Sequence, residues 1–198
     1  SLMAKYKVNE IFYSLQGEGR WAGRPAIFVR FSGCNLKCPF CDTDFKDFKE
    51  MGKIDILEAI QKVGGNCKFI VFTGGEPTLQ VDKELTFLLQ KRGYYLSIET
   101  NGTHKIPNGI NWVTCSPKCL FVKNAQPIVK NAHEVKVVFD GKHAIDDFGI
   151  DAEYYYVQPC DTGDKAKNAD ILKQTVAFVK AHPKWSLSLQ QQKIINVR

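Results

Sequence analysis

The chain has 198 residues, of which 44% are hydrophobic, and a formal net charge of +6. This length suits a single domain, expected over residues 1–198, and no apolar run is long enough to span a bilayer. Ser1 and Leu2, which precede Met3, are expected to be an addition to the native chain. The lysines and arginines are scattered, which argues against a nucleic-acid-binding surface. Seven cysteines, three of them close together, argue against a disulfide framework and for a reducing, cytoplasmic location.

Runs of β-branched and aromatic residues predict strands, and apolar residues at helical spacing predict helices. The predicted strands are 26–31, 69–72, 95–99, 112–115, 134–139, 154–158 and 185–189. The predicted helices are 55–63, 81–92 and 169–182, the last with Ile171, Leu172, Val176 and Val179 facing inward. Strands that alternate with helices predict a mainly parallel sheet. Because 101–111 and 116–133 have the composition of loops, we predict an incomplete (β/α) barrel with some helices shortened or lost.

Three cysteines lie close together after the first of these strands. Cys34, Cys38 and Cys41 form a C-x3-C-x2-C array, and no further cysteine or histidine follows directly. Three thiolates can bind three irons of a cubane iron–sulfur cluster and leave the fourth iron open to a small molecule. The spacing alone leaves open a structural zinc site completed from a distance, for instance by Cys67 or His104.

Polar motifs follow six of the predicted strands. They occupy residues 34–41, 74–77, 99–102, 116–118, 158–159 and 190–193. The carboxyl ends of parallel strands meet at one edge of a sheet, where open α/β sheets and β/α barrels build their active sites. We therefore expect a single active site at this edge.

The cysteine array and the later motif Thr73-Gly74-Gly75-Glu76-Pro77 together resemble the radical S-adenosylmethionine (SAM) superfamily. In that superfamily the cysteines bind a [4Fe-4S] cluster, and the glycine-rich turn meets the amino group of SAM. A more specific resemblance, to the 7-carboxy-7-deazaguanine synthase family, runs in order from about residue 8 to the C-terminus. The matching stretches are 13–19, 23–30, 33–34, 41–43, 73–77, 99–104, 112–114, 116–118 and 187–190.

The resemblance implies a lyase that converts 6-carboxy-5,6,7,8-tetrahydropterin to 7-carboxy-7-deazaguanine with loss of ammonia, in the biosynthesis of queuosine and related deazapurines. Reductive cleavage of SAM would generate a radical that abstracts hydrogen from C6 of the pterin, before ring contraction. The expected partners are the pterin, an electron donor such as a flavodoxin or ferredoxin, and a second copy of the chain. Neither nucleic acid nor a membrane is expected. A different radical SAM enzyme, such as a glycyl-radical activase, and a zinc-binding nucleic-acid module remain the alternatives.

The resemblance also assigns site residues, while the radical chemistry itself would belong to SAM and the cluster. Cys34, Cys38 and Cys41 would bind the cluster, and Thr43 would contribute to Mg²⁺. SAM would contact Phe40, Cys41, Asp42, Gly75, Glu76, Ser116, Pro117, Lys118 and Gln158. The substrate would contact Leu15, Gln16, Gly17, Glu18, Arg30, Thr73 and the terminal Arg198.

Two of these residues have ordinary structural interpretations as well. The guanidinium of Arg30 suits a substrate carboxylate, but a strand arginine can also form a surface ion pair. The hydroxyl of Thr43 could instead belong to a turn or a helix cap.

One stretch departs from the pattern of the family. Where related enzymes usually continue with Thr-His-Lys, this chain has Gln191-Gln192-Lys193. Gln192 can form hydrogen bonds but cannot be protonated, so an acid–base role at this position is in doubt.

Overall fold

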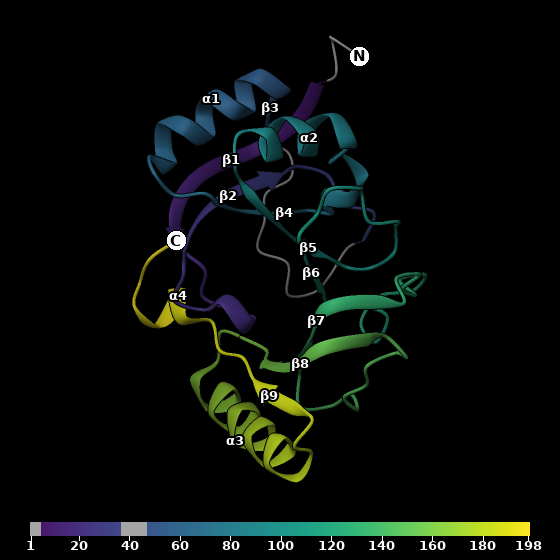
Figure 1. Ribbon diagram of the computed structural model, residues 1–198. Coiled ribbons are helices and arrows are strands. Elements are labelled where there is room, and N and C mark those ends of the chain that lie inside the picture. Colours follow the sequence, from purple (N-terminus) through teal and green to yellow (C-terminus); the bar gives the residue numbers. More distant parts are fainter. Residues whose placement is uncertain (1–4, 37–46) are drawn as a thin grey trace.

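A computed structural model of the chain describes residues 5–36 and 47–198 (Figure 1). Its nine strands form one sheet in the order β3-β1-β2-β4-β5-β6-β7-β8-β9. The strands are β1 Lys5–Leu15, β2 Pro25–Phe31, β3 Lys49–Gly52, β4 Phe69–Gly74, β5 Tyr95–Thr100, β6 Trp112–Cys115, β7 Asn131–Phe139, β8 Asp151–Pro159 and β9 Trp185–Leu187.

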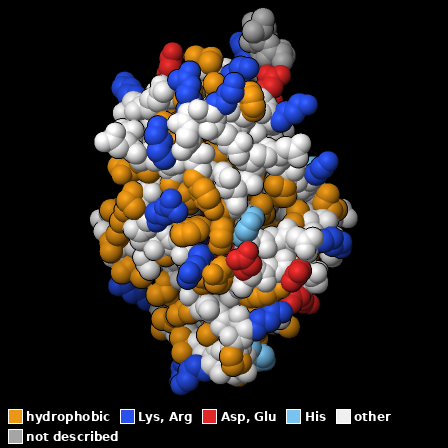
Figure 2. All heavy atoms as spheres, viewed as in Figure 1, with side chains coloured by type: hydrophobic (Ala, Val, Ile, Leu, Met, Phe, Trp, Pro, Cys, Tyr) orange, Lys and Arg blue, Asp and Glu red, His pale blue; other side chains and the backbone are white. Residues whose placement is uncertain are grey.

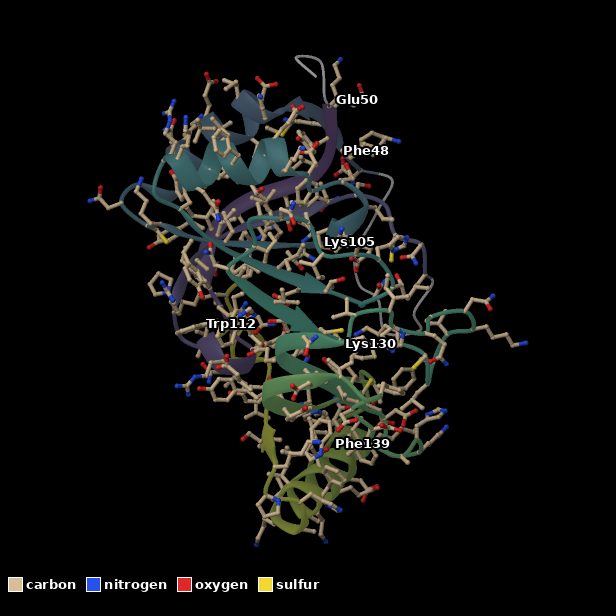
Figure 3. The ribbon with its side chains drawn as sticks, turned by 45° about the vertical axis from the view of Figure 1, so that its right-hand side comes forward. Phe48, Glu50, Lys105, Trp112, Lys130 and Phe139 are labelled. Carbon is tan, nitrogen blue, oxygen red and sulfur yellow. The ribbon has the colours of Figure 1, made fainter. Side chains whose placement is uncertain are left out.

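Seven of these strands run parallel to one another. Each neighbouring pair from β2 through β4 to β9 is parallel, whereas β1 pairs antiparallel with both β2 and β3. Their carboxyl ends therefore meet at one edge of the sheet. In Figure 3, Trp112 marks the starting edge of these strands and Phe139 marks the carboxyl edge.

The helices cover two separate parts of the sheet. They are α1 Lys53–Gly64, α2 Lys83–Lys91, α3 Lys165–Ala181 and α4 Gln191–Ile194, with short 3-10 helices η1 Gly19–Trp21 and η2 Pro77–Leu79. Figure 1 shows α1 and α2 over the part of the sheet around β1 and β2, and α3 beside β8 and β9. The connections from β5 through β8 contain no helix, so the predicted incomplete (β/α) barrel is confirmed.

The hydrophobic cores explain why α1 and α2 formed where the sequence indicated. Ile56, Ile60, Leu85 and Leu89 are fully buried against the apolar face of β2, β4 and β5. Asp82 begins α2 by accepting a hydrogen bond from the Leu85 backbone N–H at 3.0 Å, which explains a start two residues later than predicted.

The predicted inner face of α3 is wrong in part. Ile171 is buried and Val179 packs against the core of β7, β8 and β9, as predicted. Leu172 and Val176 are instead 39% and 38% exposed. The buried face of α3 continues through Thr175, which is one helical turn from Ile171 and Val179.

Strands β1 and β3 are absent from the sequence-based prediction. In β1 the buried Tyr6 and Val8 alternate with the exposed Lys5 and Lys7. This alternation is typical of a strand that has one buried face. At the other end of the sheet, β9 stops at Leu187, two residues before the predicted end.

The side of the sheet that α1 and α2 do not cover has aromatic residues at its starting edge. The ring centroids of Trp21 and Trp112 are 5.0 Å apart, and Trp21 also contacts Phe69 edge-on at 6.3 Å. The guanidinium of Arg24 lies 4.1 Å from the centre of the Phe69 ring. We call Trp21, Arg24, Phe69, Tyr95 and Trp112 the aromatic cluster.

Lysine and arginine side chains are spread over the whole face drawn in Figure 2, with several of them near its upper end. Within residues 5–36 and 47–198, every helix is too short or too polar to cross a membrane.

Candidate active site

A cavity of about 310 Å³ lies toward the carboxyl edge of the parallel strands. Its walls come from the end of β1, the loop that follows it, β2, β4, β5 and the C-terminal segment 190–198. The lining residues are Phe12, Leu15, Gln16, Gly17, Glu18, Phe28, Arg30, Thr73, Glu99, Gln190, Gln192, Lys193, Val197 and Arg198. All the residues that the sequence assigned to the substrate lie in this set.

The loop between β1 and β2 brings its residues to the cavity through backbone hydrogen bonds. The backbone N–H of Gln16 donates to the Arg24 carbonyl at 2.8 Å, and the backbone N–H of Gly23 donates to the Gln16 carbonyl at 2.6 Å. Gln191 donates from its backbone N–H to the Gly17 carbonyl at 3.0 Å, which attaches the C-terminal segment to this loop. A Cβ atom at Gly17 would overlap the side-chain oxygen of Gln192.

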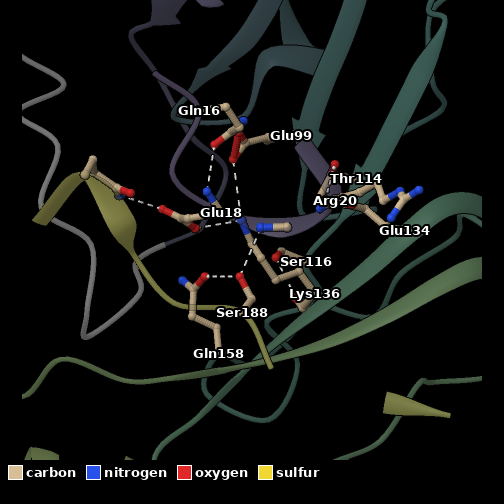
Figure 4. Close-up of polar contacts among 12 residues, drawn as sticks. Gln16, Glu18, Arg20, Glu99, Thr114, Ser116, Glu134, Lys136, Gln158 and Ser188 are labelled. Atoms are coloured by element: carbon tan, nitrogen blue, oxygen red, sulfur yellow. Dashed lines mark hydrogen bonds and ion pairs between the residues drawn. The ribbon is translucent and has the colours of Figure 1, made fainter. Parts of the chain in front are cut away.

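A buried ammonium group supports one wall of the cavity (Figure 4). Lys136 Nζ lies 2.7 Å from Glu18 Oε1 and 3.6 Å from Glu99 Oε1. Glu134, on the same face of β7 as Lys136, accepts hydrogen bonds from Thr114 Oγ1 at 3.0 Å and the Arg20 backbone N–H at 2.9 Å. We call Glu18, Glu99, Glu134 and Lys136 the charge cluster.

The environment separates the acidities of two carboxyl groups in this cluster. Burial alone would raise the pKa of Glu18, but the charge and hydrogen bond of Lys136, together with hydrogen bonds from Gln192 and Gln158, lower it to about 2. Burial raises the pKa of Glu134, against hydrogen bonds that lower it. Burial would lower the pKa of Lys136, yet the surrounding carboxylates raise it, so the ammonium stays charged.

Two glutamines hold the carboxylates of the cavity wall. Gln16 donates from Nε2 to Glu99 Oε2 at 3.3 Å and accepts a hydrogen bond from the Glu18 backbone N–H at 3.2 Å. Gln192 donates from Nε2 to Glu18 Oε2 at 2.9 Å. The position at which the chain departs from the family pattern is therefore part of the cavity wall and contacts Glu18.

Positive groups occupy another part of the wall. Arg30, which lies on the same face of β2 as Phe28, donates from Nε to Glu10 Oε1 at 3.1 Å. The side chain of Arg198 pairs with the other oxygen of Glu10. Lys193 lies 3.3 Å from Asp161. Carboxylates therefore line one part of the cavity wall and guanidinium groups line another.

The glycine-rich turn after β4 is attached to the start of the cysteine array. Gly75 donates from its backbone N–H to the Phe31 carbonyl at 3.0 Å, and Glu76 donates to the Gly33 carbonyl at 2.9 Å. A Cβ atom at Gly75 would overlap the Gly33 carbonyl, so glycine is required for this close approach. The two motifs lie side by side because of these contacts.

The carboxylate of Glu76 is directed into the protein. Glu76 is 1% exposed and accepts hydrogen bonds from Thr100 Oγ1 at 2.6 Å and the Asn101 backbone N–H at 2.7 Å. These bonds hold the turn in place after β4.

Only the first ligand of the predicted cluster lies in the described part of the chain. Cys34 is partly buried and accepts a weak hydrogen bond from the Leu36 backbone N–H at 3.4 Å, a contact that favours a thiolate. The remaining predicted residues of this loop, Cys38, Phe40, Cys41, Asp42 and Thr43, lie outside the described residues. Cys34 beside the glycine-rich turn fits a cluster that SAM completes.

Of the two distant ligands considered for a zinc site, one is in the wrong place. Cys67 precedes β4 and contacts the Pro25 carbonyl at 3.6 Å, at the starting edge of the sheet. Cys34 follows β2 at the carboxyl edge. Because β2 and β4 are parallel, these two thiols lie at opposite ends of the strands.

The other residues assigned to SAM lie at or just after the carboxyl ends of strands. Ser116, which is followed by Pro117 and Lys118, donates from Oγ to the Lys136 carbonyl at 2.6 Å. Gln158 Oε1 accepts a hydrogen bond from Ser188 Oγ at 3.0 Å. Gln158 also lines a second cavity, of about 110 Å³, which shares Gln190 and Lys193 with the first. The two cavities are thus neighbours.

Lys136 was not among the residues predicted from the sequence, and Glu99 was predicted without a role. Glu134 and Lys136 alternate with valines in β7, and charged residues are expensive inside a parallel sheet unless they are paired. This alternation was a signal that could have located the cluster.

Comparisons with known proteins agree with the motifs. The model of the radical SAM superfamily matches residues 28–156. The 7-carboxy-7-deazaguanine synthase of Bacteroides thetaiotaomicron is 43% identical over 97% of this chain and 98% of that protein. The one from Burkholderia multivorans is 39% identical over 97% of this chain and 99% of that protein. The crystal structure of QueE from Escherichia coli matches with a TM-score of 0.75 and 28% identity over 94% of both chains.

Proposed function

Because the chain belongs to the 7-carboxy-7-deazaguanine synthase family of the radical SAM superfamily, we propose that it converts 6-carboxy-5,6,7,8-tetrahydropterin to 7-carboxy-7-deazaguanine with release of ammonia. The observation that carries the proposal is the cavity, which is lined by every residue assigned to the substrate. This membership disfavours a zinc-binding nucleic-acid module.

The cavity suits a flat, polar ligand with a carboxylate. Arg30 offers a guanidinium to the carboxylate, while Gln16, Gly17 and Glu18 offer side-chain and backbone groups to a heterocycle. Phe12 and Phe28, whose rings stack with centroids 5.1 Å apart, form an apolar part of the wall. These residues would bind and orient the substrate and exclude water.

The cofactors are proposed from the family and from the fit of the residues. Cys34, Cys38 and Cys41 would bind a [4Fe-4S] cluster, and the backbone of the turn at Gly75 would face the amino acid part of SAM. When bound, the cluster and SAM would supply the hydrogen-abstracting chemistry, while the protein supplies binding and orientation. Thr43 would contribute to Mg²⁺, which prefers oxygen ligands and keeps several waters.

Further parts of the proposal concern organisation and partners. We propose that the chain works as one radical SAM domain, because one continuous sheet connects both halves. A flavodoxin or ferredoxin would supply the electron. A homodimer is proposed from the family alone.

The deciding experiment is anaerobic cluster reconstitution followed by incubation with SAM, a reductant and the carboxy-tetrahydropterin. We expect 7-carboxy-7-deazaguanine and ammonia in equal amounts. SAM cleavage without this product, together with radical labelling of a partner protein, would favour a glycyl-radical activase. The Arg30→Met variant serves as the matched control, since it should still bind the cluster and SAM but should lose its affinity for the substrate.

A further inference from the structure

Lys136 is a buried charge that the binding of substrate does not directly require. Its side chain is 7% exposed and it does not line the cavity, yet its ammonium reaches two glutamates that do. A buried ion pair seldom stabilises a fold more than apolar residues of the same size would. The position of Lys136 therefore suggests a role in arranging Glu18 and Glu99.

Both glutamates keep hydrogen-bonding capacity for a ligand. Lys136 engages one oxygen of Glu18 and Gln192 the other, and Gln158 adds a further hydrogen bond to this carboxylate. Lys136 and Gln16 likewise engage one oxygen each of Glu99. A carboxylate has about four acceptor positions, so each glutamate can accept further N–H donors. Their side chains are 17% and 23% exposed, and both line the cavity.

The charges of the cluster favour donors over acceptors at this wall. One ammonium faces Glu18, Glu99 and Glu134, so the wall stays negative even when Glu134 is protonated. An N–H group would be attracted to such a wall and a carboxylate repelled. Arg30, which pairs with Glu10, supplies the positive charge of the same cavity.

We propose that Lys136 is a positioning residue for substrate binding, and that its ammonium holds Glu18 and Glu99 so that both accept hydrogen bonds from ring N–H groups of the substrate. The inference rests on the proposed function, because a tetrahydropterin supplies such N–H groups. Lys136 acts only through the two glutamates and touches no reacting atom.

The first test compares Lys136→Met with Lys184→Met in the cluster-loaded enzyme. Lys184 forms a surface pair with Asp147, remote from the cavity, so its removal controls for the loss of a lysine–carboxylate pair. For Lys136→Met we expect the Kd and KM of the carboxy-tetrahydropterin to rise about 10- to 100-fold, the range for losing hydrogen bonds to charged groups. SAM binding and iron content should match the wild type, and Lys184→Met should leave all these values unchanged.

The second test is the pH profile of kcat/KM. The titratable groups that face Lys136 are Glu18, Glu99 and Glu134. Without the ammonium, burial would raise the pKa of Glu18, and a protonated carboxyl accepts hydrogen bonds poorly. We expect kcat/KM of Lys136→Met to fall as the pH decreases from 8 to 5.5, relative to the wild type at each pH.

A double variant separates positioning from folding. Lys136→Met with Glu18→Gln removes the unpaired buried charge, so its Tm should recover toward that of the wild type while the KM stays high. The proposal is overturned if Lys136→Met lowers only the Tm and leaves both the substrate Kd and the pH profile unchanged, or if the double variant restores the KM. A wild-type enzyme that makes no deazaguanine would instead contradict the proposed function.

Discussion

The two ends of the parallel strands bury their side chains in opposite ways. At the starting edge the aromatic cluster packs ring against ring, with Arg24 stacked on Phe69. Toward the carboxyl edge the charge cluster surrounds a cavity. Close packing leaves little room for a ligand, whereas paired charges around a cavity retain unused acceptors and donors. The difference predicts that substitutions at the first end change stability and those at the second change binding.

The largest expected loss of stability comes from Trp112→Ala. Trp112 is 7% exposed and contacts Trp21, His133 and Tyr154. Removing a buried tryptophan side chain costs about 3–5 kcal/mol in the free energy of unfolding. Urea unfolding should show this loss, while the KM of the protein that remains folded should stay within about twofold. A tenfold change of KM at unchanged stability would mean that the two ends are not independent.

Two arginines on one stretch of chain give the sharpest comparison, because Arg24 precedes β2 and Arg30 lies near its end. Arg30→Met removes the proposed partner of the substrate carboxylate. The lost interaction is worth about 2–5 kcal/mol, so kcat/KM should fall roughly 30- to 5000-fold. Arg24→Met removes cation–π contacts with Phe69 and Trp21, which should cost about 0.5–2 kcal/mol of stability. Steady-state kinetics and thermal unfolding of both variants test whether Arg30 acts on binding and Arg24 on stability. Equal effects of the two variants on kcat/KM would contradict this division.

The sequence predicted one part of this molecule better than the other. The seven parallel strands, β2 and β4 to β9, were recognised because they are rich in apolar, β-branched and aromatic residues, as a parallel sheet buried on both faces requires. In β1 charged residues interrupt the apolar pattern, since the exposed Lys5 and Lys7 alternate with the buried Tyr6 and Val8, and the strand was missed.

The cavity residues within the family-like motifs could be assigned by resemblance, but the contacts that these residues make could not. Glu99 pairs in register with Thr114, and Thr114 pairs with Glu134, so three strands place these side chains in one row. Register between distant strands depends on the whole sheet and not on the local sequence. The meeting of Lys136 with Glu18 and Glu99 therefore became visible only in the fold.

Glu18 should contribute to the stability of the fold in acid. Because Lys136 and hydrogen bonds lower the pKa of Glu18 to about 2, against its ordinary value of 4.5, the folded state favours the ionised form. This contribution is complete above pH 4.5 and is lost as the pH falls toward 2. Urea unfolding at a series of pH values should show that the free energy of unfolding declines in this range. The decline should be smaller in the Glu18→Gln variant.

Glu134 should behave in the opposite way, since its pKa is raised by burial. Its contribution is present below its unfolded pKa and is lost as the pH rises through the folded value. The stability of the Glu134→Gln variant, compared with that of the wild type at the same pH, should therefore increase as the pH rises. The same pH dependence in both glutamine variants would contradict the separation of the two carboxyl groups.

The smallest expected effect, Gly17→Ala, tests how the C-terminal segment closes the cavity. The added Cβ would overlap the side-chain oxygen of Gln192 and lie 2.8 Å from its backbone nitrogen, so the segment must move. Overpacking of this kind costs about 1–3 kcal/mol. Because the segment is largely exposed, it can move without unfolding the protein. We therefore expect the substitution to raise the KM of the substrate and to change the Tm only slightly.

Gly23→Ala is the matched control for this variant, because it lies in the same loop with nothing within 4 Å of an added Cβ. Its positive φ of 90° carries a strain of its own, so it should lower the Tm slightly without raising the KM. Trimming the overlapping side chain in Gly17→Ala with Gln192→Ala should recover little activity, since the backbone of Gln192 would still be too close. Full recovery in that double variant would show that the side-chain contact alone, and not the path of the segment, sets the cavity wall.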